Sequence, residues 1–273
     1  MTAATAPPHF LTHFAISWEL DAAGMTGGAT LDPQLCLPGS STPRAAALAV
    51  LADNAAGYVG AFALDEIAPT IDLSLHVFRT PSEPTVAYKC RPLRRGRRVA
   101  VLETWFTTPG HAEPWAVSVA TFLGTGRPDP VIHVMPTADE PPFTPASELD
   151  EPLDRRLGIT VLAPGVLGLP RRDHVSNGRG TVQGGIVALL IERACESALA
   201  DARDPGGGPI GDAQVVTGLD VRYLGAVRRG PARAEASVLR DDDGGSHLWV
   251  TVVDAGDDDR LVAHAFVTTR STP

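Results

Sequence analysis

The chain has 273 residues, of which 44% are hydrophobic and 20% are charged, and its formal net charge is −9. This length and balance suit one large or two ordinary globular domains with a sizeable core. The negative charge argues against a general nucleic-acid-binding surface, and the first residues lack the basic, apolar and small-residue pattern of an export signal. We therefore expect a cytoplasmic protein with no nucleic-acid partner.

The three cysteines, Cys36, Cys90 and Cys195, form no CxxC pair. An odd number without ligand spacing predicts neither a disulfide framework nor a zinc cluster. The histidines likewise lack ligand spacing, and none pairs with an obvious nucleophile motif. We expect buried thiols and no metal.

In the first half, the apolar segment 45–64 carries one carboxylate, Asp53. Thr42 and Pro43 predict the N-cap and first turn of a helix. A buried amphipathic helix is favoured over a membrane span because Asp53 and Asn54 lie at its centre. An unpaired charge in apolar surroundings is costly, so Asp53 is either solvated or functional. Four alternating segments predict strands at 70–78, 84–93, 97–107 and 115–124.

The proline- and acid-rich segment 125–152 has no hydrophobic period and predicts an extended linker. After it the same order of elements recurs. The expected helix and strands cover 184–201, 216–224, 232–240, 246–254 and 261–270. Residues 44–53 align without a gap over 183–192, so Glu192 is the counterpart of Asp53. The sequence therefore predicts an internal duplication. Its divisions are a first unit, a linker and a second unit: 1–124, 125–152 and 153–273.

The motif SNGRGTVQGGIVALLIE, residues 176–192, resembles the helix-start motif of hotdog-fold acyl-CoA thioesterases of the phenylacetic-acid-pathway type. That motif has an Asn, a His-Gly-Gly and a carboxylate in order, which here are Asn177, Gln183-Gly184-Gly185 and Glu192. The resemblance implies an α+β fold of two tandem hotdog units, each a curled antiparallel sheet wrapped around a central α-helix.

The first half resembles the same family through LADN at 51–54 and through Thr70, which follows Asp53 by 17 residues. The resemblance therefore covers nearly the whole chain as two copies. It implies hydrolysis of an acyl-CoA thioester without a cofactor. It also implies that the helix start and the acid of one site come from opposite units.

Thioester hydrolysis needs a donor that polarises the carbonyl and a group that delivers water or attacks, and a carboxylate suits the second task. Gly184 and Gly185 lack side chains, so a carbonyl can approach the helix-start N–H groups, where the helix dipole favours negative charge. Close helix packing is the alternative explanation of the pair. Glu192 lies eight residues from Gly184, about 12 Å along the helix, so the two cannot share one thioester carbon.

One expected site combines Asn177 and Gly184 of the second half with Asp53 and Thr70 of the first. Gln183 replaces the histidine of the resembled motif, which leaves the backbone donors intact, and Gly185 adds to the substrate-binding surface. The alternatives without a catalytic role are that Asp53 is solvated or capped within its helix, and that Thr70 is a β-branched strand residue.

The other expected site combines Glu192 and Thr217 with the start of the first helix. There Pro38 stands at the asparagine position, and Ala45 and Ala46 replace the glycines. Proline offers no donor, and the alanine side chains would crowd a carbonyl. We expect one working site and one degenerate site. A reversed assignment, in which Glu192 is catalytic, stays open.

Coenzyme A brings three phosphate groups, so an acidic protein that binds it needs a local basic site. Arginine suits phosphate because its guanidinium is a planar fork, and a cluster follows Arg91. The candidate phosphate ligands are Arg94, Arg95, Arg97 and Arg98. The related turn of the second half holds the acidic run 241–243, which would repel a nucleotide. A solubilising hairpin tip is the alternative explanation of these arginines.

The sequence predicts an acyl-CoA thioesterase with acyl-CoA as its partner, no metal and no membrane contact. Association of two chains through their sheets is left open. Two other functions also stay open: a noncatalytic acyl-CoA or acyl-carrier binding protein, and a hotdog dehydratase or hydratase. The second is disfavoured because neither helix start carries a histidine with a nearby acid.

Overall fold

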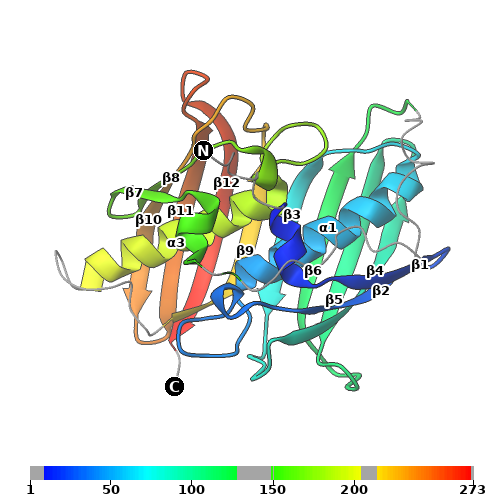
Figure 1. The fold of residues 1–273 in the computed structure, drawn as a ribbon, viewed down its shortest axis with the longest axis horizontal. Coiled ribbons are helices and arrows are strands. Elements are labelled where there is room, and N and C mark those ends of the chain that lie inside the picture. The colour runs from blue at the N-terminus through cyan, green and yellow to red at the C-terminus, as the bar shows by residue number, and fades with distance from the viewer. Residues whose placement is uncertain (1–8, 128–148, 150, 204–213, 272–273) are drawn as a thin grey trace, which may run out of the picture.

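The computed structural model describes residues 9–127, 149, 151–203 and 214–271. Twelve strands of this part of the chain form one antiparallel sheet in the order β1-β2-β4-β5-β6-β3-β9-β12-β11-β10-β8-β7. The two long helices, α1 (Ala45–Leu64) and α3 (Gly184–Arg203), lie on the same face of this sheet (Figure 1).

Each half supplies six strands. Those of the first half are β1 (Ser17–Asp21), β2 (Gly24–Thr30), β3 (Thr70–Val77), β4 (Thr85–Arg95), β5 (Val99–Thr107) and β6 (Pro114–Leu123). Those of the second half are β7 (Thr160–Ala163), β8 (Val166–Leu169), β9 (Gln214–Tyr223), β10 (Ala232–Asp242), β11 (Gly245–Asp254) and β12 (Arg260–Ser271). The short helices are η1 (Phe10–Phe14), η2 (Pro33–Leu35), α2 (Leu153–Leu157) and η4 (Asp173–Val175).

The sheet order of one half mirrors that of the other about the β3–β9 junction. β3 and β9 pair antiparallel, with Asp72 opposite Arg222 and Leu75 opposite Leu219. The order β3-β6-β5-β4-β2-β1 on one side matches β9-β12-β11-β10-β8-β7 on the other. The predicted duplication implies such a symmetry, and the β3–β9 pairing joins the strands of both halves into one continuous sheet.

The core lies between the sheet and the two helices. Alanines fill much of α1, and its residues 46–50 are fully buried. Small side chains let the helices approach closely: a Cβ added to Gly185 would lie 2.6 Å from Val50 Cα. Helix α1 is long and apolar enough to cross a membrane, and 67% of the tested segment is buried inside the fold. The three cysteines are buried and free, as the sequence predicts.

The predicted N-cap of the first helix is wrong. Helix α1 begins at Ala45, and the residue before it, Arg44, makes no side-chain capping bond. Thr42 instead donates its hydroxyl to the Pro81 carbonyl at 2.9 Å. An isolated antiparallel bridge pairs Pro43 with Cys36 in this segment.

The predicted long helices and eight long strands match the structure to within a few residues. Strands β1, β2, β7 and β8 have no counterpart in the sequence prediction. Most of the predicted linker lies outside the described residues. Its first residues are held by Glu66, which accepts hydrogen bonds from Thr125 N–H at 2.8 Å and from Gly126 N–H at 2.9 Å.

Candidate active site

Asp53 lies in the middle of α1 and is only 7% exposed. Its Oδ1 accepts a hydrogen bond from the Thr70 hydroxyl at 2.7 Å, and its Oδ2 accepts one from the Gly185 N–H at 3.1 Å. Thr70 begins β3, whereas Gly185 belongs to the first turn of α3. The structure therefore brings together the acid and threonine of the first half and the glycines of the second.

Burial raises the pKa of the Asp53 carboxyl above its ordinary value, and the hydrogen bonds from Thr70 and Gly185 lower it part of the way back. A carboxylate with a raised pKa is a stronger base, provided that it is ionised at the working pH. The two donors hold its oxygens in place. Asp53 thus has the environment of a general base.

The two glycines at the start of α3 do different things. Gly185 gives its N–H to Asp53, and its missing side chain lets Val50 pack against the helix. The Gly184 N–H has no acceptor among the described residues, and a Cβ at Gly184 would lie 3.0 Å from Asp53 Oδ2. The close-packing explanation of the pair thus applies to Gly185, whereas the role of the Gly184 N–H as a donor to a carbonyl stays a prediction.

Asn177 is exposed, and the structure gives it no bond to Asp53. Its Oδ1 accepts hydrogen bonds from the Arg179 N–H at 3.0 Å and from the Thr181 N–H and hydroxyl at 3.3 and 3.1 Å. These contacts close the loop that precedes α3. A catalytic role for Asn177 stays a prediction.

The counterpart of Asn177 in the first half is Leu37. The Leu37 N–H donates to the Thr42 carbonyl at 2.8 Å, as the Asn177 N–H donates to the Thr181 carbonyl at 2.8 Å. The ungapped alignment had placed Pro38 there, because the first-half loop is one residue longer. Leucine also lacks an amide, so the expected asymmetry between the two loops holds.

Gln183 is buried just before the glycine pair, and its Oε1 has no partner in the described part of the chain. Buried polar groups of this kind are usually satisfied by a bound water or ligand. Its counterpart in the first half is Arg44. The residue before the helix start is therefore a neutral glutamine in one half and an arginine in the other.

Glu192 occupies the equivalent position on α3. Its Oε2 accepts a hydrogen bond from the Ala46 N–H at 2.5 Å, and its Oε1 lies 3.5 Å from Arg44 Nη1. Arg44 also pairs with Glu196, which pairs in turn with Arg193. Burial raises the pKa of Glu192 to about 6, although Arg44 opposes the shift. Both oxygens of Glu192 are thus occupied inside an ionic network.

Thr217, the threonine assigned to this second site, donates its hydroxyl to the Thr268 carbonyl at 3.5 Å. It has no bond to Glu192 in the described structure. The acid of the second half therefore lacks the hydroxyl partner that Asp53 finds in Thr70. The structure supports the prediction that the two sites are unequal.

Comparison with known proteins shows the fold. No protein-family model matches the sequence, and no curated protein matches it. A protein of Novosphingobium aromaticivorans, provisionally assigned as a thioesterase, is 19% identical, covers 95% of this chain and 99% of its own, and has a TM-score of 0.62. The 12:0-ACP thioesterase of Umbellularia californica is 12% identical, covers 90% of this chain and 94% of its own, and has a TM-score of 0.60. A hot dog fold protein of Alicyclobacillus acidocaldarius is 12% identical, covers 98% of this chain and 99% of its own, and has a TM-score of 0.55.

The chain has the hotdog fold. At these identities the likeness concerns the fold, and it includes proteins named as thioesterases. In hotdog terms, α1 and α3 are the central helices of the two units. Asp53 therefore lies on the central helix of one unit and meets the start of the central helix of the other.

The arginine turn of this hotdog chain, Arg94, Arg95, Arg97 and Arg98, connects β4 and β5. Its position follows from the strand register. Thr70 pairs with Phe122, which pairs with Ala100, so the turn, which comes just before the first residue of β5, lies at the end of the strands where β3 begins. Two strand spacings, about 10 Å, separate β3 from β5. The turn therefore lies on the same side of the molecule as the Asp53 site.

Two arginines of this turn already hold backbone carbonyls. Arg95 Nη2 donates to Ala22 at 3.0 Å, and Arg98 Nε donates to Gly124 at 3.1 Å. Arg94 and Arg97 have no polar side-chain partner among the described residues and are exposed. These two guanidinium groups are therefore the more available of the four.

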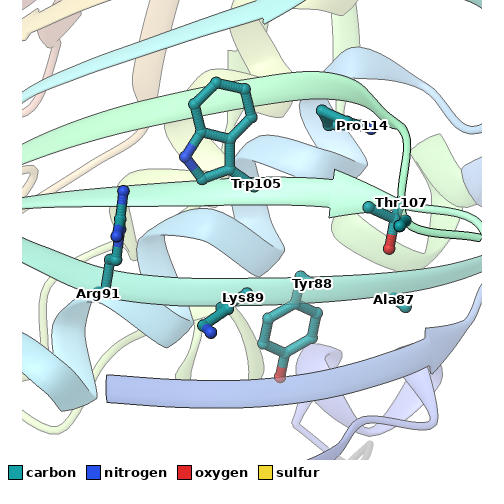
Figure 2. A pocket seen from close by; sticks show the side chains of 8 residues that line it. Ala87, Tyr88, Lys89, Arg91, Trp105, Thr107 and Pro114 are labelled. Atoms are coloured by element: carbon teal, nitrogen blue, oxygen red, sulfur yellow. The ribbon is translucent and has the colours of Figure 1, made fainter. Parts of the chain in front are cut away.

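A separate hollow of about 470 Å³ opens on β4 and β5 (Figure 2). Its lining includes Lys89 and, opposite it in the register, Trp105. Trp105 and His76 both pair with Val117, so they lie level with each other across the sheet. His76 is about 20 Å along β3 from Thr70. Asp53 does not line this hollow, so it is not part of the candidate site.

The sequence does not predict two residues of the site. Tyr223 ends β9 and donates its hydroxyl to the Gly184 carbonyl at 2.9 Å. Arg44 fills the position opposite Glu192. The alignment of Arg44 with Gln183 was a usable signal for the second, but nothing in the strand pattern singled out Tyr223.

Proposed function

We propose that this protein hydrolyses acyl-CoA thioesters at one working site built from both hotdog units. The observation that carries the proposal is the buried Asp53 carboxylate, held between the Thr70 hydroxyl and the first turn of α3. It places a base beside a helix start whose Gly184 N–H is open. The structural neighbours named as thioesterases support the same class of reaction.

The reaction follows from these groups. The thioester carbonyl oxygen accepts the Gly184 N–H, where the helix dipole stabilises the negative charge that develops. Asp53 takes a proton from water as the water oxygen bonds to the carbonyl carbon, and Thr70 fixes the carboxylate. The carbon–sulfur bond then breaks, and the proton passes to the departing thiolate. A direct attack by Asp53, followed by hydrolysis of the anhydride, uses the same geometry.

The environment of Glu192 supports a single working site. Its carboxylate accepts the Ala46 N–H as Asp53 accepts the Gly185 N–H, but its other oxygen faces the Arg44 guanidinium where Asp53 has the neutral Thr70 hydroxyl. The positive charge of Arg44 stabilises ionised Glu192 and makes it a weaker base. We assign Glu192 a structural role that ties α3 to the start of α1. The reversed assignment would require Arg44 to leave this buried network.

The nature of the thiol carrier rests on the arginine turn. One structural neighbour is named as a 12:0-ACP thioesterase, and an acyl-carrier protein and coenzyme A share the pantetheine arm. Coenzyme A adds a nucleotide whose phosphates match exposed guanidinium groups. We propose that coenzyme A is the thiol carrier of the substrate. The chain would then be an acyl-CoA thioesterase of the phenylacetic-acid-pathway type, whose helix-start motif residues 176–192 resemble.

A panel of acyl-CoA esters with straight, branched and aromatic acyl groups tests the proposal. Release of free thiol is measured for the purified chain and for Asp53→Asn. We expect release from at least one ester and its loss in the variant. Tight binding of an ester without thiol release would indicate a binding protein, and hydration of an enoyl-CoA would indicate a hydratase.

A further inference from the structure

Tyr223 is connected to Asp53 through a single peptide group. Its hydroxyl donates to the Gly184 carbonyl at 2.9 Å, and the Gly185 N–H donates to Asp53 Oδ2 at 3.1 Å. The Gly184 carbonyl and the Gly185 N–H belong to the same planar peptide unit. The hydroxyl, the peptide and the carboxylate therefore form one continuous chain of hydrogen bonds.

We propose that Tyr223 is a positioning residue, which orients and polarises the Gly184–Gly185 peptide so that this peptide holds the Asp53 carboxylate. The inference rests on the proposed function for its catalytic consequence. Its effect on the state of Asp53 can be measured whether or not a substrate is known.

The glycine pair explains why the Gly184–Gly185 peptide needs a side chain to hold it in place. Glycine has the greatest backbone freedom of any residue, and two glycines in succession open α3 at the point where Asp53 must be held. The β3–β9 register pairs Asp72 with Arg222, which places Tyr223 next to the first residues of β3, beside Thr70. Tyr223 therefore fixes the peptide from the sheet side, opposite the helix that carries Asp53.

The electrostatics keep the Tyr223 hydroxyl a donor. Burial, together with the charges of Asp53 and Asp72, raises the pKa of Tyr223 well above its ordinary value. A donor on the peptide carbonyl increases the polarity of the N–H at the other end, because hydrogen bonds in a chain strengthen one another. The Gly185 N–H then stabilises ionised Asp53 more strongly.

The surroundings of Glu192 contain no equivalent of the Tyr223 hydrogen bond among the described residues. β3 is the counterpart of β9, and it ends at Val77 where β9 ends at Tyr223. Valine has no hydroxyl, and Arg44 occupies that site instead. Among the described residues, a tyrosine hydroxyl thus holds the helix start that faces Asp53 and not the one that faces Glu192.

The test replaces Tyr223 by Phe and follows the Asp53 carboxyl by ¹³C NMR titration. We expect a higher pKa for Asp53 in Tyr223→Phe, because its N–H donor is less polarised and less well held. With a hydrolysed ester, kcat should fall about 10-fold, as for one lost hydrogen bond, and the acid limb of kcat/KM should move to higher pH. Tyr58→Phe is the matched control, because Tyr58 lies on α1 against Trp18, with no described bond to Asp53.

Replacement of the tyrosines by 3-fluorotyrosine gives a second measurement on a nearly unchanged fold, since the chain has only three of them. The more acidic phenol is a stronger donor, so the pKa of Asp53 should fall. An Asp53 pKa that does not respond to either change would overturn the inference. A wild-type chain that releases no thiol but shows both pKa shifts would refute the proposed function and leave the positioning role of Tyr223 in place.

Discussion

Asp53 and Gly185 are 132 residues apart in the sequence and are joined by a hydrogen bond of 3.1 Å. The pseudo-symmetric bond joins Glu192 to the Ala46 N–H at 2.5 Å. Each central helix therefore begins against the acid of the other. The exchange is thus present in both directions, but only Glu192 also pairs with an arginine, Arg44.

Substitutions at the two glycines that start α3 should have different effects, one on catalysis and the other on packing. In Gly184→Ala the new Cβ lies 3.0 Å from Asp53 Oδ2, so we expect kcat/KM to fall at least 10-fold. Stability should hold or rise by up to about 1 kcal/mol, because alanine favours a helix over glycine. Steady-state kinetics and urea unfolding measure the two effects.

Gly185→Ala is the matched variant. Its Cβ would meet Val50 Cα at 2.6 Å, and overpacking against backbone costs about 1–3 kcal/mol. We expect this variant to unfold at lower urea concentration than Gly184→Ala. Equal stabilities for the two variants would contradict the division of labour between these glycines.

The raised pKa of Asp53 predicts opposite trends for activity and stability. The base must be ionised, so kcat/KM should fall as the pH drops through a value above the ordinary 3.8. The folded state holds this proton more tightly than the unfolded state, so ionisation of Asp53 lowers the unfolding free energy as the pH rises through the same range. At neutral pH Asp53→Asn should be at least as stable as the wild type in thermal unfolding. A clear loss of stability would show that the carboxylate is needed for folding.

The two free members of the arginine turn should affect binding more than chemistry. We expect Arg94→Ala with Arg97→Ala to raise KM for an acyl-CoA more than it lowers kcat, because phosphate contacts far from the carbonyl bind ground and transition states alike. The difference should shrink as salt is added. The same acyl group on pantetheine, which lacks the nucleotide, is the control. Equal losses on both substrates would assign these arginines to the fold.

The composite site predicts that neither half works alone. A protease site is inserted in the segment 125–152, which the sequence predicts to be a linker, so that the chain can be cut after folding. The nicked protein should stay active, because β3 and β9 still pair. After separation in denaturant, each fragment should be inactive and a refolded mixture active. Hydrolysis by the isolated second half would point to Glu192 and a self-paired site.

The sequence predicts the elements that have a strong period and misses those that depend on distant partners. The alanine-rich helix is visible as a long apolar run, which the structure buries almost all round, and the long strands are visible because burial alternates every two residues. β2, with three glycines in seven residues, has no such pattern. Thr42 looked like a cap, but its hydroxyl found the Pro81 carbonyl 39 residues away.

The site shows the same division. The pairing of Asp53 with the second helix start is implied by the resemblance to hotdog thioesterases, and the distance between the acid and the glycines of one helix agrees with it. Tyr223 and Arg44 could not be assigned, because their roles depend on the β3–β9 register and on the crossing of the two helices. These are tertiary relationships that local spacing does not carry.

The most direct test of the central claim compares kcat/KM for the wild type, Asp53→Asn and Glu192→Gln on the same acyl-CoA, read by thiol release. Both substitutions are nearly isosteric, and both acids are buried against a helix start. We expect Asp53→Asn to lose about 10²–10⁴ of the rate, the range typical of a general base, and Glu192→Gln to keep the rate within about threefold of wild type. Equal losses, or a larger loss in Glu192→Gln, would contradict a single working site at Asp53.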